Sequence, residues 1–280
     1  MATLVALALF GLVGGIGITA LGPGGVLPTV GLFTLTDLSP AEVAGTAIVT
    51  HIATGVLATA AYTRSGQLRE PATRRTALVL CAAALVGTPI GVAVNTAVSE
   101  RAFGLVLAAL VAGAAALLWY RGRRDRRGAA EAHVHASEAH VHPAETRAHP
   151  AETRAHPAET RAHPTALPVA VLGAGVALVA GIVGIGGPML TVPLLIVLGL
   201  PVLEALAAAQ AQSIVIATVG AAGYLAHGAV DWRLTLVVGA PELAGVLLGW
   251  KIAQRIPTRG LKNALIIVLF ALAPYLALHG

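Results

Sequence analysis

The chain has 280 residues, of which 56% are hydrophobic and only 11% are charged, and its formal net charge is +5. Soluble domains have about 45 to 50% apolar and about 25% charged residues, so this composition excludes an ordinary soluble protein and indicates an integral membrane protein. The single cysteine, Cys81, excludes an internal disulfide. Residues 1–10 have no lysine or arginine ahead of the first apolar run, so we interpret this run as a membrane helix and not as a signal peptide.

Ten apolar segments follow in order, five on each side of a polar stretch at residues 121–166. They span residues 2–20, 25–36, 41–61, 76–95, 102–120, 167–183, 188–199, 203–226, 234–253 and 261–278. Most hold roughly 20 residues, enough for a helix to cross a bilayer. The second segment of each half holds about 12 residues, or about 18 Å of helix, less than the roughly 30 Å hydrocarbon core. We expect these two to be half-helices or strongly offset spans, with Pro28 and Pro193 in their first turns.

The two halves repeat the same pattern. Gly22, Pro23 and Pro28 match Gly187, Pro188 and Pro193 at a constant offset of 165, and further matches continue downstream at slightly smaller offsets. A doubled apolar chain with a Gly/Pro-broken segment in each half is typical of a secondary transporter whose site lies at the repeat interface. We therefore predict an all-α integral membrane protein of two homologous repeats. The glycine pairs at matching places, which we expect to allow close helix packing, are Gly87 with Gly91 and Gly245 with Gly249.

The distribution of lysine and arginine among the loops indicates how the chain is oriented in the membrane. If every segment crosses, the loops at residues 64–75, 121–127 and 251–262 share one side, and only Arg101 and Arg233 lie on the other. Basic loops favour the cytoplasm, which puts both termini outside and makes the halves inverted. If the short segments re-enter instead, the halves are parallel and the last basic loop moves outside, which fits the charges less well.

The polar stretch at residues 121–166 repeats every seven residues from Glu131 onwards and contains seven of the ten histidines. Prolines in its later units forbid a continuous coiled coil, so we predict a disordered cytoplasmic linker between a first repeat at 1–120 and a second at 167–280. Neutral imidazoles can capture zinc or nickel. Ligands at a fixed spacing in a flexible chain define no closed site, however, so we favour a polar spacer.

A glycine-rich break interrupts the apolar sequence once in each half. Unpaired backbone amides are tolerated in hydrocarbon only where they line a cavity or are buried in protein. Each break precedes a helix start, where free N–H groups and the helix dipole favour an anion. The breaks can also serve only close helix crossing, but their recurrence at matching places favours binding. The candidate residues are Gly22, Pro23, Gly24, Gly25, Gly184, Gly186, Gly187 and Pro188.

Polar side chains lie on the third segment of each half. The first half carries Thr46, Thr50 and Thr54 at intervals of four, on one helix face with His51 beside them. The second half carries two glutamines and a serine at the corresponding places. Such groups can hydrogen-bond an oxyanion or hold helices together. The candidate substrate ligands are Thr46, Thr50, His51, Gln210, Gln212 and Ser213.

Two ionisable side chains, His51 and Glu242, lie inside apolar segments and are functional candidates for that reason. Histidine titrates near neutral pH, which suits a proton relay or a pH-dependent anion site. Glu242, after Pro241, can couple protons, pair with a basic side chain or be a structural carboxylate. We assign His51 and Glu242 as candidates for coupling. Glu42 and Glu204 occupy matching helix starts, where a carboxylate complements the macrodipole, and we interpret them as structural.

These residues, in this order, resemble the TauE/SafE sulfite exporter family, also called the 4-toluene sulfonate uptake permease family. The resemblance rests on the glycine-rich turn and proline at 184–193, on the Leu-Ser-Pro-x-Glu-x-x-Gly-Thr block at 38–46, and on the stretch from Tyr224 to Arg233. It covers both repeats. The resemblance implies an integral membrane protein that moves sulfite, sulfonates or related anions.

We therefore predict a multi-pass cell-membrane transporter that passes a small oxyanion, either sulfite or an organosulfonate, by alternating access at a midplane site between the broken segments. A divalent-metal transporter is the alternative, but the membrane segments hold too few ligands for a dication. The chain has no His-Glu-x-x-His, Gly-x-Ser-x-Gly or ATP-binding loop, so we expect no enzyme. We expect no cofactor, no resident metal and no nucleic-acid partner, and the partners are the small anion and the bilayer.

Overall fold

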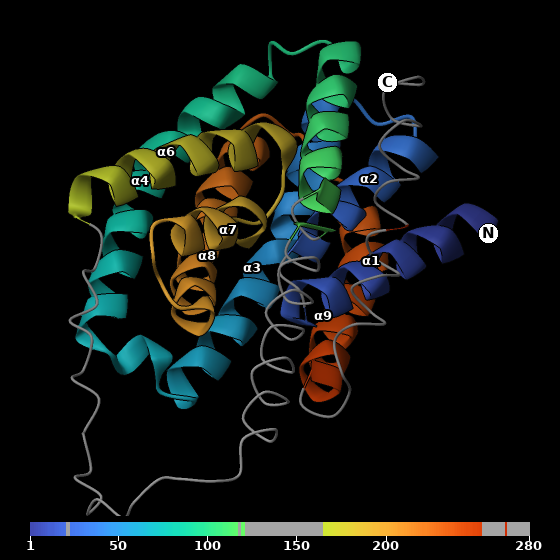
Figure 1. The fold of residues 1–280 in the computed structure, drawn as a ribbon. Helices are drawn as coiled ribbons and strands as arrows, with labels where there is room; N and C mark the ends of the chain where they lie inside the picture. Colours follow the sequence, from blue (N-terminus) through green and yellow to red (C-terminus); the bar gives the residue numbers. More distant parts are fainter. Residues whose placement is uncertain (21–22, 117–118, 121–164, 254–266, 268–280) are drawn as a thin grey trace, which may run out of the picture.

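The computed structural model describes residues 1–20, 23–116, 119–120, 165–253 and 267, and every regular element within them is helical. The first half contains α1 (Ala2–Ala20), η1 (Pro23–Gly25), α2 (Val26–Leu35), α3 (Pro40–Arg64), η2 (Gln67–Arg69) and α4 (Pro71–Asn95), followed by a helix at residues 100–116. The second half contains α6 (Ala166–Val183), α7 (Pro188–Val197), α8 (Val202–Ala226) and α9 (Trp232–Ala253). The predicted all-α fold is confirmed (Figure 1). The expected segment at 261–278 and the repetitive part of the linker lie outside these residues.

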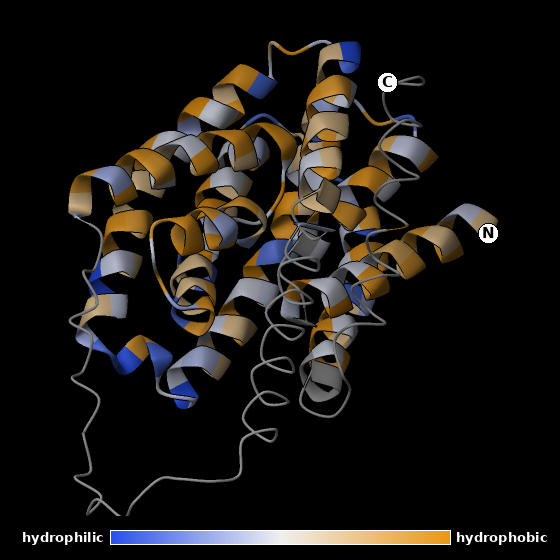
Figure 2. Ribbon diagram, in the orientation of Figure 1, coloured by the Kyte–Doolittle hydropathy of each residue, from blue (hydrophilic) through white to orange (hydrophobic). Residues whose placement is uncertain are grey.

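Six helices in this part of the chain, namely α1, α3, α4, α6, α8 and α9, are long and apolar enough to cross a membrane. Hydrophobic residues run along their whole length, and hydrophilic ones gather mostly at helix ends and loops (Figure 2). Large apolar side chains such as Leu85 and Leu236 are exposed on the outside, where a lipid environment favours them. By contrast, α2 and α7 have 10 residues each, about 15 Å of helix, which confirms the two short segments. The chain is a multi-pass membrane protein.

Local sequence signals explain where the helices begin and end. Ser39 and Glu42 form a capping box at the start of α3, in which the Ser39 hydroxyl accepts from the Glu42 N–H and the Glu42 carboxylate accepts from the Ser39 N–H. This contact agrees with the structural role predicted for Glu42. α6 ends at Gly184, which has a positive φ of 72° that favours glycine.

The two prolines of the short helices occupy different places. Pro28 lies in the first turn of α2, which begins at Val26, as predicted. The prediction for Pro193 was wrong, because α7 begins at Pro188 and Pro193 lies inside the helix. Pro188 takes the first helical position, where a missing N–H costs nothing. Pro193 removes the donor that would otherwise reach the carbonyl of Met189.

The helices of the two halves pack against each other reciprocally. The first helix of each half contacts a long helix of the other half, so that α1 packs on α9 and α6 packs on α4 (Figure 1). A Cβ atom at Gly245 would overlap the carbonyl oxygen of Leu12, and one at Gly87 would overlap that of Ala174. The prediction that the paired glycines allow close helix packing is confirmed.

The centre of the molecule contains α3 and α8, which pack against each other between these two outer pairs (Figure 1). The short helices α2 and α7 lie against α3 and α8 respectively. The Thr29 hydroxyl of α2 donates to the carbonyl of Gly184 at 3.4 Å, which links the short helix of one half to the glycine turn of the other. Both breaks therefore lie at the centre of the fold.

Candidate functional site

The two glycine-rich breaks approach the same side chain, His51 of α3. A Cβ atom at Gly25 would lie 3.5 Å from His51 Cε1, and one at Gly186 would lie 3.8 Å from His51 Cγ. The same Cβ at Gly186 would lie 3.0 Å from the hydroxyl oxygen of Ser213. The imidazole therefore lies in van der Waals range of the turn from each half.

A small cavity lies where these elements meet. It is lined by Ile18, Gly25, His51, Thr54, Gly186, Pro188, Met189, Gln210 and Ser213, and therefore by residues of both halves. It has room for about one water molecule. A ligand larger than a water molecule does not fit in this arrangement of the helices.

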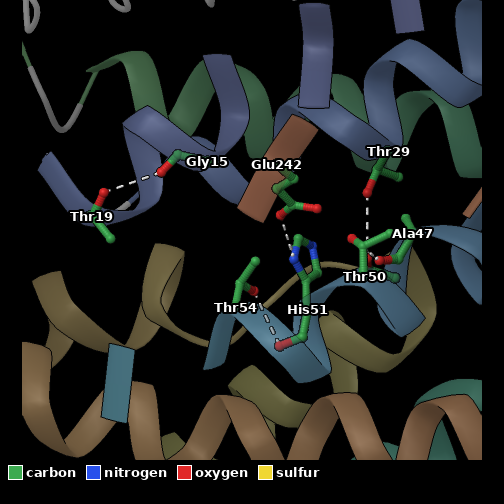
Figure 3. Close-up of polar contacts among 9 residues, drawn as sticks. Gly15, Thr19, Thr29, Ala47, Thr50, His51, Thr54 and Glu242 are labelled. Atoms are coloured by element: carbon green, nitrogen blue, oxygen red, sulfur yellow. Dashed lines mark hydrogen bonds and ion pairs between the residues drawn. The ribbon is translucent and has the colours of Figure 1, made fainter. Parts of the chain in front are cut away.

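His51 carries the strongest electrostatic feature of the site. The side chain is buried, and its Nδ1 lies 3.0 Å from Oε1 of Glu242, which is 0% exposed on α9 (Figure 3). This is the one ion pair within the described residues. Because Nδ1 faces Glu242, Nε2 is the ring nitrogen left for a ligand. Nε2 is buried and has no hydrogen-bond partner in the described part of the chain.

Gln210 and Ser213 supply further polar groups on α8. Both residues are buried and line the cavity, and neither side chain makes a hydrogen bond within the described residues. Buried polar groups usually have partners, so unpaired amide and hydroxyl groups beside an unpaired imidazole call for an explanation. Together they can donate hydrogen bonds to one small acceptor in the cavity.

The threonine stripe contributes one lining residue. The Thr54 hydroxyl borders the cavity and donates to the carbonyl of His51 at 3.2 Å. The Thr46 hydroxyl instead accepts from the Asp231 N–H at 3.0 Å, and the Thr50 hydroxyl donates to the carbonyl of Ala47 at 2.8 Å (Figure 3). Neither Thr46 nor Thr50 lines the cavity.

Thr54, Ile18 and Met189 line the cavity, although the sequence analysis did not include them among the ligands. The stripe of threonines could have indicated Thr54, because it lies one turn after His51 on the same helix. No comparable signal existed for Ile18 or Met189, since apolar residues are found throughout the membrane segments.

Gln212 lies beside the cavity without lining it. Its Oε1 accepts from the Thr191 hydroxyl at 2.7 Å, and its Nε2 donates to the carbonyl of Gly173 at 3.0 Å. These bonds connect α8 to α7 and α6. Gln212 is therefore fully engaged between helices, in contrast to Gln210.

The remaining glycines divide between the cavity and the helix contacts. A Cβ at Gly24 would overlap the backbone of α1, and one at Gly184 would overlap the backbone of Ala44. A Cβ at Gly187 would lie 3.0 Å from the Ile216 side chain and 3.5 Å from Oε1 of Gln212. Pro23 begins η1, and Gly22 lies outside the described residues.

Two short helices begin beside this cavity. α2 and α7 have glycine N-caps, Gly25 and Gly187, and neither has a side chain that caps the first turn. Gly25, Pro188 and Met189 line the cavity, so both helices start at its wall. The positive ends of two helix dipoles near one cavity favour an anion.

The ionisable residues do not form a metal site. The described residues contain no group of three or more His, Cys, Asp or Glu side chains that could hold a metal ion. Nothing in this part of the chain supports the divalent-metal alternative.

The described residues contain six candidate spans, two short helices that each follow a glycine-rich turn, and a small buried cavity lined from both halves. These features are those of a helical membrane protein of the transporter class. The chain belongs to the TauE/SafE family, because the family model for the sulfite exporter TauE/SafE matches residues 7–276. Membership places it among membrane exporters of sulfite and related sulfur anions, which are transporters and not enzymes. No curated protein and no solved structure shows a significant match to the chain.

Proposed function

We propose that this protein moves a small sulfur oxyanion, either sulfite or an organosulfonate, by alternating access through the cavity at His51. The observation that carries the proposal is the buried Nε2 of His51, which has no hydrogen-bond partner among the described residues and lies where a glycine turn from each half meets. An unpaired buried polar group costs about 1 to 3 kcal/mol, so an anion that accepts from Nε2 when this nitrogen carries a proton offsets that cost.

The chemistry of the cavity supports an anion as the substrate. His51, Gln210 and Ser213 offer N–H and O–H donors, and the starts of α2 and α7 add positive dipole ends. Among the described residues, Glu242 is the one carboxylate near the cavity, and it is already paired with His51. An oxyanion with three oxygens can use several of these donors at once.

The packing of the halves supports alternating access. We take residues 1–120 and 167–280 as two repeats joined by the linker at 121–166, with the halves inverted as the loop charges favour. The pairs α1 with α9 and α4 with α6 lie on either side of α3 and α8. A movement of one outer pair relative to the other would open the cavity first to one side and then to the other.

Counterflow in proteoliposomes tests the proposed function. Vesicles preloaded with unlabelled anion should transiently accumulate labelled sulfite, thiosulfate or methanesulfonate in a saturable way. We expect Gln210→Leu to weaken the apparent affinity by about tenfold to a hundredfold, because a hydrogen bond to a charged ligand contributes about 1.5 to 3 kcal/mol.

Gln212→Leu is the matched comparison, because its amide is already bound by Thr191 and Gly173. It should reduce the amount of folded protein in the membrane and leave the affinity of the remaining protein within about threefold of wild type. Folded wild-type protein that exchanges none of the three anions faster than empty vesicles would contradict the proposal.

A further inference from the structure

Glu242 is a buried carboxylate whose one ionisable neighbour in the described part of the chain is His51. Neither of its oxygens accepts a hydrogen bond from the described residues. Its backbone packs against Gly15 of α1, a helix that has no ionisable side chain. A carboxylate buried inside a membrane protein is costly, so its presence beside the anion site requires a reason.

Other ionisable groups on the neighbouring helices are distant along the chain. The nearest one to His51 on α3 is Glu42, about nine residues or 13 Å away, and it is engaged in the capping box. On α9 the nearest ones to Glu242 along the chain are Arg233 and Lys251, each nine residues away, and on α8 the ionisable groups are Glu204 and Tyr224 near the two ends. The short helices α2 and α7 have none. The charge state near the cavity therefore depends on His51 and Glu242 together.

The geometry of the pair assigns different roles to the two ring nitrogens. A carboxylate 3.0 Å from Nδ1 favours a proton on that nitrogen. In the neutral ring, Nε2 then has a lone pair and no proton, so it repels an anion in the cavity. After a second proton adds to Nε2, that nitrogen becomes a donor, and the nearby carboxylate stabilises the resulting imidazolium by Coulomb attraction.

We propose that Glu242 is a positioning residue that makes anion binding depend on one proton at Nε2 of His51, so that each anion crosses together with one proton. This proposal rests on the proposed function. The proton comes from water on the side from which the anion enters, adds to the Nε2 lone pair and returns to water where the anion leaves. No bond in the anion forms or breaks. A monoanion and a proton together carry no net charge across the membrane, which avoids the cost of moving a bare charge.

Anion binding measured against pH tests the role of Glu242. The full-length wild type and E242Q are purified in detergent, and the binding of labelled sulfite, thiosulfate and methanesulfonate is measured from pH 5.5 to 8. At pH 7.5 we expect E242Q to bind about tenfold more weakly than wild type, because its imidazolium lacks the carboxylate. At pH 5.5 the two proteins should agree within about threefold, because the higher proton concentration favours the imidazolium in both.

Two further variants separate charge from packing. Glu242→Asp keeps a carboxylate but moves it one methylene farther from His51. Its affinity for the anion at pH 7.5 should therefore lie between the affinities of wild type and E242Q. Glu204→Gln makes the same change at the start of α8, away from the cavity. The ratio of its anion affinity to that of wild type should be the same at every pH. The proposal would be overturned if E242Q bound the anion more weakly than wild type by the same factor at every pH, or if it bound as tightly as wild type at every pH.

Proton uptake supplies a second measurement that needs no variant. Thiosulfate and methanesulfonate do not take up protons near neutral pH, so a pH indicator in weak buffer reports protons that bind the protein. We expect about one proton per bound anion at pH 7.5. Anion binding without proton uptake would reject the role of Glu242 and leave the proposed function intact, whereas failure of all three anions to bind would reject the proposed function itself.

Discussion

At the scale of single residues, the site depends on the surroundings of one imidazole. His51 contacts a carboxylate through Nδ1, and its Nε2 has no partner in the part of the chain that the structure describes, while glycine backbone from each half lies against its ring. Every donor on the cavity side is neutral except His51 when it is protonated. The charge of this residue therefore decides how strongly the cavity attracts an anion.

Replacing His51 with glutamine tests this dependence. Glutamine keeps a hydrogen-bond donor but cannot titrate, so we expect transport to persist weakly and to lose its pH dependence between about pH 5.5 and 7.5. Initial rates of labelled-anion uptake at several pH values check the prediction. His227→Gln, at the exposed end of α8, is the matched control and should keep the wild-type pH profile. A wild-type profile in the His51 variant would make His51 a packing residue.

At the scale of secondary-structure elements, the glycine turns fix where α2 and α7 begin. Both helices start at the cavity wall with glycine N-caps, and both are too short to cross the membrane. The turns differ in detail, because η1 leads directly into α2, whereas α6 ends at Gly184 with a positive φ and the chain then reaches Pro188. Similar sequences thus bring two helix N-termini to one place through different local conformations.

Substitutions at Gly25 test the role of the first turn. A Cβ there makes ordinary contact with His51 at 3.5 Å, so Gly25→Ala should keep transport within about threefold. Gly25→Val adds two branched methyl groups against the imidazole and the cavity, and we expect transport below about a tenth of wild type with protein still in the membrane. Counterflow normalised to membrane-inserted protein measures both.

Gly175→Val, on the outer face of α6 where a Cβ meets nothing within 4 Å, controls for the general cost of valine in place of glycine. Wild-type affinity in a folded Gly25→Val protein would show that the turn has no part in binding.

At the scale of the whole molecule, the two halves do not form separate bodies. α1 packs on α9 and α4 packs on α6, so each half completes the outer layer of the other around α3 and α8. The Thr29 hydroxyl and the carbonyl of Gly184 add a contact between the halves at the centre. Because the halves are held together by these contacts, the linker between them need only connect their ends.

Replacement of the linker tests this view. Exchanging residues 129–164 for a Gly/Ser spacer of similar length should leave anion transport within about twofold of wild type, because a flexible connection adds no site of its own. Thr165 is kept, since it is the residue before the first turn of α6. Counterflow with and without added zinc or nickel measures the effect. Complete loss of transport, or a metal dependence that the replacement abolishes, would assign the histidines a direct role.

The sequence by itself determined the membrane class, nearly all helix positions and the two short helices. It could do so because a bilayer requires long apolar segments and penalises unpaired backbone, which leaves a clear record in residue type and spacing. It also indicated His51, Gln210, Ser213 and the glycine turns, because polar groups are rare in such segments. The error at Pro193 arose because Pro188 supplied an equally good helix start five residues earlier.

Only the tertiary structure decided which of these residues act together. The sequence treated His51 and Glu242 as separate candidates, and the packing of α9 against α1 and α3 brings them to 3.0 Å. The tertiary structure likewise distinguished Gln210, which lines the cavity, from Gln212, which holds three helices together. The physical reason is that spacing along one helix specifies a shared face, whereas contacts between distant helices depend on how their side chains fit once the whole bundle has packed.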